Sequence, residues 1–393
     1  MPLTWRQPRS AATGAVSRDP ARPLAGVHVV DFGAYVAGPL GAQCLADFGA
    51  EVIKVEPIGG EKGRNLNQFT ACQRGKRSLA IDLRHPMAAP VRTRLLEWAD
   101  LVTHNMRSNA AAKLGIDEAA IRATNPRAVM ALSSGYGERG KWAPLPAFDP
   151  TGLALSGWEQ QISGPGQRPT FLRNSSMDCQ TGLALFVGSS LALFARERSG
   201  SPTVVRSSLM AVGATTTSET LLVDGTTPAP FDHIDAEQTG VSPFCRIYPT
   251  SSGWVAVDAV TVDQRGELLQ AINVTTSAAL AEAFTRVTAD EVIVVLQRAG
   301  IPSELVREDH RDRFFDVELA AEQGLVHRIA PTPYGWFESP SGFWSGAAGL
   351  LRNAQHIAGI GEHSTSVLQD LGFAEGEIRD LVDSGAVQDG SAP

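Results

Sequence analysis

LAGVHVVDFGAYVAGPLGAQCLADFGAEVIKVEP (residues 24–57) contains two apolar runs separated by a stretch of small residues. The runs at 24–33 and 50–57 end at glycine or proline, which predicts two buried strands. Residues 38–49 lie between them and predict a short helix. A strand, a helix and a strand in this order form a βαβ unit, in which the two strands pair in parallel.

The same alternation continues along the chain. We predict strands at 76–83, 100–106 and 127–137, with helices at 90–99 and 116–126 between them. Alternating strands and helices are typical of a parallel sheet that is covered by helices on both faces. The predicted fold class is therefore α/β, with a large doubly wound, Rossmann-like domain.

The later part of the chain predicts a second domain. We assign residues 24–223 to the large α/β domain, residues 224–243 to a linker rich in Thr, Pro and Asp, and residues 244–334 to a smaller α+β domain. The smaller domain begins with a predicted hairpin at 244–260. Residues 1–23 are polar and rich in Pro and Arg, which predicts a flexible N-terminal extension rather than a secretory signal.

The composition is that of a globular protein and excludes several functions. Of 393 residues, 43% are apolar, and 34 basic against 42 acidic residues give a net charge of −8. Such a chain is a poor partner for nucleic acid, and its longest apolar stretch, 181–195, is too short to span a bilayer. Four separated cysteines indicate neither a disulfide framework nor a metal cluster. We expect a cytoplasmic protein without nucleic-acid, membrane or metal partners.

The first βα turn is a candidate nucleotide site. Its glycines, Gly33, Gly38 and Gly41, follow the spacing G-x4-G-x2-G, whereas dinucleotide-binding turns follow G-x-G-x-x-G. Glu56 ends the second predicted strand, where such enzymes carry a ribose-binding acid. Because the glycine spacing fails, close packing of helix on sheet explains these residues better. No nicotinamide cofactor is predicted.

Residues 62–113 reverse the charge of the chain. This segment has ten basic and three acidic residues, a net charge of +7, which predicts a patch that receives an anion. A solvated helix face explains Arg92 and Arg94 equally well. It explains the R-G-K-R turn at 74–77 less well, because that turn lies at a strand edge beside a glycine.

Asp178 precedes a long apolar helix that is predicted at about 180–198. A carboxylate at this place is usually an N-cap or first-turn residue. The same position favours the ionised form of the side chain, which suits a nucleophile. Both roles stay open from these residues alone. Cys179 is a rival nucleophile, but a small residue at the head of a packed helix explains it better.

Eight segments follow one another in a recognisable order: residues 24–57, RGKRSLAIDL, HNMRSNAAAKLGID, NPRAVMALSSGYGERGKWAPLPAFD, SSMDCQTGLALFVGSSLALFARERSG, SPFCRIYPTSSGWVAV, AGIPSELV and GEHSTSVLQDLGF. Together they resemble the family III CoA-transferases, a group that also contains the α-methylacyl-CoA racemases. The resemblance implies a large α/β domain that is completed by the C-terminal segment 335–393, with the smaller domain inserted. It also implies an interlocked homodimer.

The resemblance places the catalytic aspartate of the family on Asp178. It implies that CoA moves from an acyl-CoA thioester to a free carboxylic acid through covalent aspartyl anhydride and thioester intermediates. Coenzyme A then enters as part of the acyl-CoA substrate, and no metal takes part. The residues that the resemblance assigns to CoA binding are Tyr35, Val36, Ala37, Lys76, Arg77, Asn105, Met106, Lys113, Phe148 and Asp149.

Two departures from the family pattern bear on function. Val36 replaces a glutamine of the formyl-CoA transferases, and with Phe148 and Met177 it predicts an acyl group larger and less polar than formate. Phe148 also occupies the place where racemases need a proton-shuttling histidine, and neither His104 nor His233 matches that position. Two alternatives stay open: a 2-methylacyl-CoA racemase or epimerase with Asp178 as one base, and a CoA-binding protein without turnover.

Overall fold

The computed structural model describes residues 22–173, 175–218, 222–228, 232–307, 322–332, 335–340, 344 and 356–390. The predicted extension 1–23 therefore lies outside the described residues, apart from Arg22 and Pro23. As far as it is described, the chain forms two compact units. The larger comprises Met1–Gly152, Asn174–Val212 and Glu318–Pro393, and the smaller comprises Leu153–Arg173 and Gly213–Val317.

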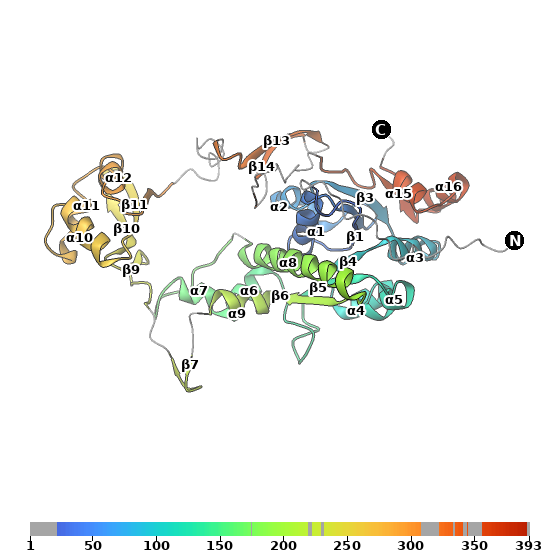
Figure 1. Ribbon diagram of the computed structural model, residues 1–393, viewed down its shortest axis with the longest axis horizontal. Coiled ribbons are helices and arrows are strands. Elements are labelled where there is room, and N and C mark those ends of the chain that lie inside the picture. Colours follow the sequence, from blue (N-terminus) through green and yellow to red (C-terminus); the bar gives the residue numbers. More distant parts are fainter. Residues whose placement is uncertain are drawn as a thin grey trace. The chain divides into compact units, whose positions relative to one another are not determined.

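The larger unit is built on a seven-stranded sheet (Figure 1). In spatial order its strands are β15 (Val387–Gln388), β3 (Lys76–Ile81), β2 (Glu51–Glu56), β1 (His28–Asp31), β4 (Leu101–His104), β5 (Val129–Ser134) and β6 (Val204–Ser208). Only β15 among them pairs antiparallel; the other six strands are parallel. The order reverses between β1 and β4, which is the point where α/β sheets of this kind bind ligands.

Both faces of the sheet are covered, because apolar side chains occupy successive positions of each central strand. In β1, Val29 belongs to one core and its neighbour Val30 to the other, as the two-residue period of a strand requires. The first core is closed by α1 (Ala37–Asp47) and α8 (Ser176–Ser199). The second is closed by α3 (Ala88–Trp98), α4 (Ser108–Leu114), α5 (Glu118–Thr124), α15 (Ser364–Asp370) and α16 (Glu375–Asp383). The predicted parallel-dominated α/β fold is confirmed.

The smaller unit contains a separate four-stranded antiparallel sheet. Its strands, in spatial order, are β12 (Ser303–Leu305), β11 (Gly253–Asp258), β10 (Cys245–Thr250) and β9 (Gly240–Ser242). The core beside this sheet contains Tyr248 stacked on Phe284 at 4.2 Å. Helical elements of this unit are α7 (Trp158–Gln161), α10 (Val262–Ala271), η2 (Ser277–Ala279), α11 (Leu280–Phe284) and α12 (Ala289–Arg298).

Several shorter elements complete the described structure. They are η1 (Lys62–Asn65), α2 (Asn67–Ala71), α6 (Asp149–Ser156), α9 (Leu209–Thr216), β7 (Leu222–Val223), β8 (Thr227–Pro228), β13 (Val326–Thr332) and β14 (Gly335–Pro340). The boundary between the units falls inside α6 and inside α9. The predicted boundary at 223/224 differs from this division, because a helix that runs across a boundary has no linker composition to mark it.

Helix α8 is, among the described helices, the one whose length and composition would allow it to cross a membrane. Its buried face packs against α1, β5 and β6, as a core helix of a globular protein does. The close contact with α1 depends on glycine: a Cβ on Gly182 would lie 2.8 Å from Cβ of Leu40, and one on Gly41 would lie 2.9 Å from the Gly182 carbonyl oxygen.

Candidate active site

The N-terminus of α8 is capped by a residue from a different helix. Ser175 precedes α8 with a positive φ of 51° and makes no capping hydrogen bond through its side chain. The carboxylate of Asp149, the first residue of α6, instead accepts hydrogen bonds from the backbone N–H groups of Met177 and Asp178, the latter at 2.9 Å. Because a helix start leaves several N–H groups without partners, Asp149 stabilises α8 as an N-cap residue would.

Asp178 lies in the first turn of α8, since the helix begins at Ser176 rather than near 180. Burial, followed by repulsion from the Asp149 carboxylate, raises the pKa of Asp178 to about 7. This corrects the expectation that the helix N-terminus keeps Asp178 ionised. The reason is that Asp149 already occupies the N–H groups that would stabilise a charge on Asp178, and it adds a second negative charge.

Cys179 is a poor competitor as nucleophile. Burial and then the two neighbouring carboxylates, Asp178 and Asp149, raise the pKa of the Cys179 thiol to about 11. The thiolate is the reactive form of cysteine, and it is scarce at neutral pH when the pKa is this high. The structure therefore favours Asp178 over Cys179.

Two glycines allow Asp149 to reach α8. A Cβ on Gly135, just after β5, would lie 2.2 Å from Cβ of Ala147, so the chain leading to Asp149 passes directly over this glycine. A Cβ on Gly152, in α6, would lie 2.7 Å from the sulfur of the fully buried Met177. Both contacts are too close for any side chain. The position of the Asp149 carboxylate thus depends on close packing of side chains against these two glycines.

The first βα turn is held rigidly at the switch point of the sheet. Tyr35 has a φ of 63°, and its N–H donates a 3.0 Å hydrogen bond to the buried carboxylate of Glu61. Asn105, which follows β4, forms two hydrogen bonds with the backbone of Ala34: its amide donates at 2.8 Å and its carbonyl accepts at 2.9 Å. Asn105 therefore positions this turn, a role that the sequence did not indicate.

Contacts connect this turn to the carboxylate pair. The rings of Tyr35 and Phe148 pack edge to face with centroids 5.3 Å apart, and Asp149 is the next residue after Phe148. Phe148 is 53% exposed, whereas Val36, Ala37 and Met177 are buried. The structure thus brings together Tyr35, Phe148, Asp149 and Asp178. Val36 and Met177 present little open apolar surface, so of the three residues thought to favour a large acyl group only Phe148 offers an exposed ring.

The basic R-G-K-R turn is used within the fold, which corrects its interpretation as an anion-receiving patch. Lys76 is buried and pairs with Asp31 at 2.8 Å, while Arg74 pairs with Asp47 at 3.4 Å. Arg77 pairs with Asp370 at 2.7 Å. The partner acids come from outside residues 62–113, so a local charge count could not reveal them. Lys76 has no exposed ammonium to offer a phosphate.

The other predicted residues are placed as follows. Met106 packs against the second core, and Lys113 is exposed in the last turn of α4. Glu56, considered above as a ribose-binding acid, is ion-paired with Arg64 and accepts a 2.7 Å hydrogen bond from Ser78. His104 is buried, and burial lowers its pKa to about 4. A histidine in this environment is neutral at physiological pH and has little access to a substrate.

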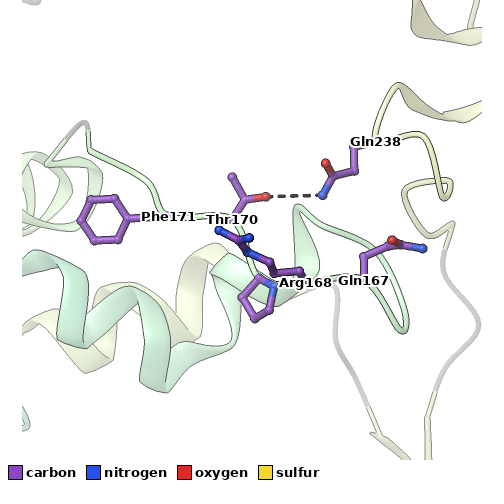
Figure 2. Close-up of a pocket in the computed structure, with 6 residues that line it drawn as sticks. Gln167, Arg168, Thr170, Phe171 and Gln238 are labelled. Atoms are coloured by element: carbon purple, nitrogen blue, oxygen red, sulfur yellow. Dashed lines mark hydrogen bonds between the residues drawn. The ribbon is translucent and has the colours of Figure 1, made fainter.

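A polar cavity of about 300 Å³ lies in the smaller unit (Figure 2). It is lined by Gln167, Arg168, Pro169, Thr170, Phe171 and Gln238. The amide of Gln238 donates a 3.4 Å hydrogen bond to the Thr170 hydroxyl, which closes one side. All the predicted site residues belong to the larger unit, and none of them lines this cavity.

Comparisons with known proteins show the family of this chain. The model of CoA-transferase family III matches residues 24–347, and this chain belongs to that family. Succinyl-CoA–D-citramalate CoA-transferase of Chloroflexus aurantiacus is 29% identical over 92% of this chain and 97% of its own length. Alpha-methylacyl-CoA racemase of Homo sapiens is 27% identical over 91% of this chain and 96% of its own.

Solved structures show the same fold. The crystal structure of Rv3272 from Mycobacterium tuberculosis matches with a TM-score of 0.75 at 26% identity, covering 89% of this chain and 99% of that one. A CAIB/BAIF family protein from Brucella suis matches with a TM-score of 0.76 at 23% identity, covering 89% of this chain and 99% of that one. The predicted family is confirmed.

Proposed function

We propose that this protein transfers CoA from an acyl-CoA thioester to a free carboxylic acid, with Asp178 as the covalent nucleophile. The observation that carries the proposal is the state of the Asp178 carboxylate. In the described part of the chain no group donates a hydrogen bond to it, and its pKa is raised to about 7. A carboxylate that is shielded from water and accepts few hydrogen bonds is a stronger nucleophile in its ionised form than a solvated one.

The proposed reaction has four balanced steps. An Asp178 oxygen attacks the thioester carbonyl, the C–S bond breaks, and CoA thiolate leaves an acyl-aspartyl anhydride. The thiolate then attacks the aspartyl carbonyl, which releases the donor acid and forms an aspartyl-CoA thioester. The acceptor carboxylate attacks this thioester and displaces the thiolate again. Finally the thiolate attacks the acceptor's carbonyl, so that the acceptor leaves as its CoA thioester and Asp178 is regenerated.

The surroundings of Asp178 support these steps. Asp149 stays bound to the start of α8 and acts on Asp178 through its charge, so we assign it a positioning and electrostatic role. The ring pair of Tyr35 and Phe148 offers an apolar surface for the pantetheine arm, and backbone groups at 35–37 can contact the nucleotide. Excluding water is essential, because water would hydrolyse the anhydride. We retain Lys113 as a phosphate contact and omit Lys76.

The substrates are proposed at the level of class. Relatives that are named for succinyl-CoA and for succinate and glutarate favour carboxylic acids larger than formate as donors and acceptors. The exposed ring of Phe148 is consistent with this choice. The particular acids are a matter for a substrate screen.

A racemase is the second candidate, supported by the match to alpha-methylacyl-CoA racemase over most of the chain. Two-sided proton transfer at Cα needs a second base opposite Asp178. Phe148 cannot supply it, and the carboxylate of Asp149 is engaged with backbone N–H groups. The transferase is therefore the better-supported function.

One experiment separates the transferase, the racemase and a CoA-binding protein without turnover. The protein is incubated with a panel of acyl-CoA thioesters and free acids, quenched, digested and analysed by mass spectrometry for a hydroxylamine-sensitive adduct. We expect the adduct on Asp178 together with CoA exchange, both lost in Asp178→Asn and retained in the control Asp82→Asn, an exposed aspartate.

Other outcomes would overturn the transferase. Deuterium incorporation at Cα without CoA exchange would identify the racemase. CoA binding with neither reaction would identify the binding protein.

We also propose that the functional unit is a homodimer and that it works in the cytoplasm. The dimer is supported by an apolar stripe on α8: Val187, Leu191 and Phe194 are 51%, 63% and 60% exposed and lie on one face of the helix. A contiguous apolar surface of this kind is typical of an interaction site. The cytoplasmic location stays a prediction.

A further inference from the structure

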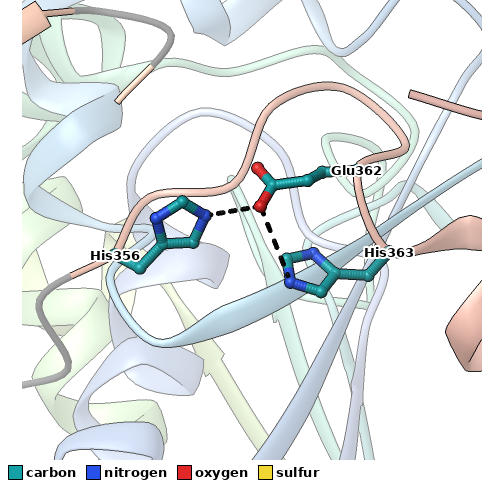
Figure 3. A group of neighbouring side chains, drawn as sticks. All are labelled: His356, Glu362 and His363. Atoms are coloured by element: carbon teal, nitrogen blue, oxygen red, sulfur yellow. Dashed lines mark hydrogen bonds and ion pairs between the residues drawn. The ribbon is translucent and has the colours of Figure 1, made fainter. Parts of the chain in front are cut away.

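The C-terminal part of the larger unit contains a cluster of two imidazoles and a carboxylate. They come from HIAGIGEH (356–363) and are the side chains of His356, Glu362 and His363 (Figure 3). Nε2 of His356 lies 2.8 Å from Oε1 of Glu362, and Nε2 of His363 lies 3.8 Å from the same oxygen. One donor atom of each residue lies within 4.8 Å of the other two. None of these residues was assigned to catalysis or CoA binding above.

The backbone holds the cluster against the edge of β3. The carbonyl of His356 accepts a 3.0 Å hydrogen bond from Gly75, and the N–H of His363 donates one of 3.0 Å to Ser78. Within the loop, the N–H of Gly359 donates at 2.7 Å to the second carboxylate oxygen of Glu362. The three side chains are therefore largely preorganised, which lowers the entropy that a ligand must overcome.

We propose that His356, Glu362 and His363 bind one divalent transition-metal ion, such as Zn²⁺, through two imidazole nitrogens and one carboxylate oxygen. Imidazole is the common protein ligand for Zn²⁺, Ni²⁺ and Co²⁺, and a carboxylate oxygen completes a three-ligand set. A water molecule occupies the remaining coordination position of the metal, because the site reaches the surface. The site is independent of the proposed transfer reaction.

The three donor atoms must move closer to metal-binding distances when an ion binds. Two ligand atoms of a tetrahedral zinc site lie about 3.4 Å apart, as follows from metal–ligand distances of roughly 2.1 Å. The separations of 2.8 and 3.8 Å to Glu362 lie on either side of this value. All three donor atoms lie within 4.8 Å of one another, so the two imidazoles move together by at most about 1.4 Å. The side chains of His356, Glu362 and His363 are 49%, 31% and 26% exposed, which leaves a path for the ion.

Three interactions oppose binding. The hydrogen bond between Nε2 of His356 and Oε1 of Glu362 is lost, because both atoms then bind the metal. The N–H of Ser78 donates to Nδ1 of His363 at 3.4 Å, and this contact is lost because Nδ1 must carry the proton when Nε2 binds a metal. Each of these hydrogen bonds contributes little to net stability, whereas a bound metal ion contributes far more. The guanidinium of Arg77 is close to His363, but its charge is offset by Asp370 at 2.7 Å.

The consequence for the fold is local. The cluster joins residues 356–363 to β3, and the same stretch leads directly into α15. A bound ion stabilises the native state over the unfolded chain, and the stabilisation grows with the concentration of free ion. We therefore expect the bound ion to stabilise the packing of residues 356–363 against β3.

The test uses the full chain without an affinity tag, dialysed against a chelator and titrated with Zn²⁺ and Co²⁺. We expect one equivalent of bound ion per chain, a Co²⁺ visible spectrum characteristic of four- or five-coordination, and a higher Tm with Zn²⁺. His356→Gln and Glu362→Gln should each weaken binding by at least about tenfold and abolish the Tm shift. The control His85→Asn, at a histidine outside the cluster, should bind as the wild type does.

Two results would overturn the proposal. Failure of the wild-type chain to take up a stoichiometric ion would show that the three side chains are only a hydrogen-bonded group. Unchanged affinity in both ligand variants would show that any ion binds elsewhere. Circular dichroism of each variant confirms folding, and the wild-type Co²⁺ spectrum decides the coordination even if a variant is unstable.

Discussion

The carboxylate of Asp149 accepts a 2.9 Å hydrogen bond from the backbone N–H of Asp178, so one aspartate caps the helix that carries the other. Two carboxylates thereby lie at the start of α8, and the pKa of each is raised, chiefly by burial. Asp149 keeps its place through backbone N–H groups, which leaves the carboxylate of Asp178 available for chemistry. This division of roles leads to the first two predictions.

Replacing Asp149 should change the pH dependence of the reaction. Asp149→Asn keeps an oxygen that can cap α8 but removes the charge that raises the pKa of Asp178. The acidic limb of the kcat/KM profile should then move to lower pH. Asp149→Ala also removes the cap and should cost about 1 kcal/mol of stability. An unshifted limb in Asp149→Asn would contradict the electrostatic role.

Asp178→Asn should stabilise the protein at high pH and change little at low pH. The pKa of Asp178 is raised from 3.8 to about 7 in the folded state, so folding favours the protonated form. The contribution of Asp178 to stability is therefore fully present below pH 4, is lost as the pH rises towards 7, and stays absent above it. We expect Asp178→Asn to raise Tm by roughly 1–3 °C at pH 8 and by less at pH 5. Equal shifts at both pH values would contradict the raised pKa.

Gly135→Ala should reduce activity without contacting the substrate. The new methyl group would lie 2.2 Å from Cβ of Ala147 and would displace the chain that leads to Asp149. We expect a stability loss of about 1–3 kcal/mol and a fall in kcat. Adding Ala147→Gly removes the clash and should restore both. Gly266→Ala, in α10 with nothing within 4 Å, is the matched control. It should leave kcat unchanged and should not lower stability, because alanine favours a helix more than glycine does.

Replacing Lys76 should lower stability, whereas replacing Lys113 should weaken CoA binding. Lys76→Met leaves Asp31 buried without its partner and should cost about 3–5 kcal/mol of stability. Lys113 is exposed, so Lys113→Met should leave the unfolding free energy nearly unchanged while raising the Kd for CoA severalfold. Chemical denaturation and isothermal titration calorimetry with CoA measure the two effects. If Lys76→Met binds CoA more weakly but is as stable as the wild type, Lys76 is a CoA contact and not a structural residue.

Leu191→Glu should disrupt the proposed homodimer. The change places a charge in the centre of the apolar stripe on α8, which costs several kcal/mol if a second copy covers it. Light scattering coupled to size exclusion should show a dimer for the wild type and a monomer for the variant. Val262→Glu, at an 81% exposed valine of the smaller unit, is the control and should remain dimeric. A monomeric wild type would refute the dimer.

Sequence patterns predicted the sheet and its helices well, because those patterns depend on neighbouring residues. The strands at 28–31, 51–56 and 76–81 lie inside the predicted segments, and the hairpin of β10 and β11 lies inside the predicted 244–260. The family, and the position of Asp178 at the start of a helix, were also predicted from the sequence. All of these signals are local periodicities or short motifs.

The ion pairs of the R-G-K-R turn could not be predicted from local sequence patterns. Arg74 pairs with a residue 27 positions away, and Lys76 with one 45 positions away. Their partners are set by how strands and helices pack, so the local excess of positive charge indicated a binding patch that the fold neutralises. The spacing H-x5-E-H at 356–363 was a visible signal, but its meaning depends on the loop that brings the side chains together.

The amino-acid order therefore determined the α/β alternation, the family and the choice of Asp178 as the proposed nucleophile. Three-dimensional packing decided the ionisation of that aspartate. Burial and the Asp149 carboxylate, which comes from a helix 29 residues earlier, raise the pKa of Asp178 to about 7. Such a shift depends on solvent exclusion and on the distance between charges, and both exist only after distant segments have packed together.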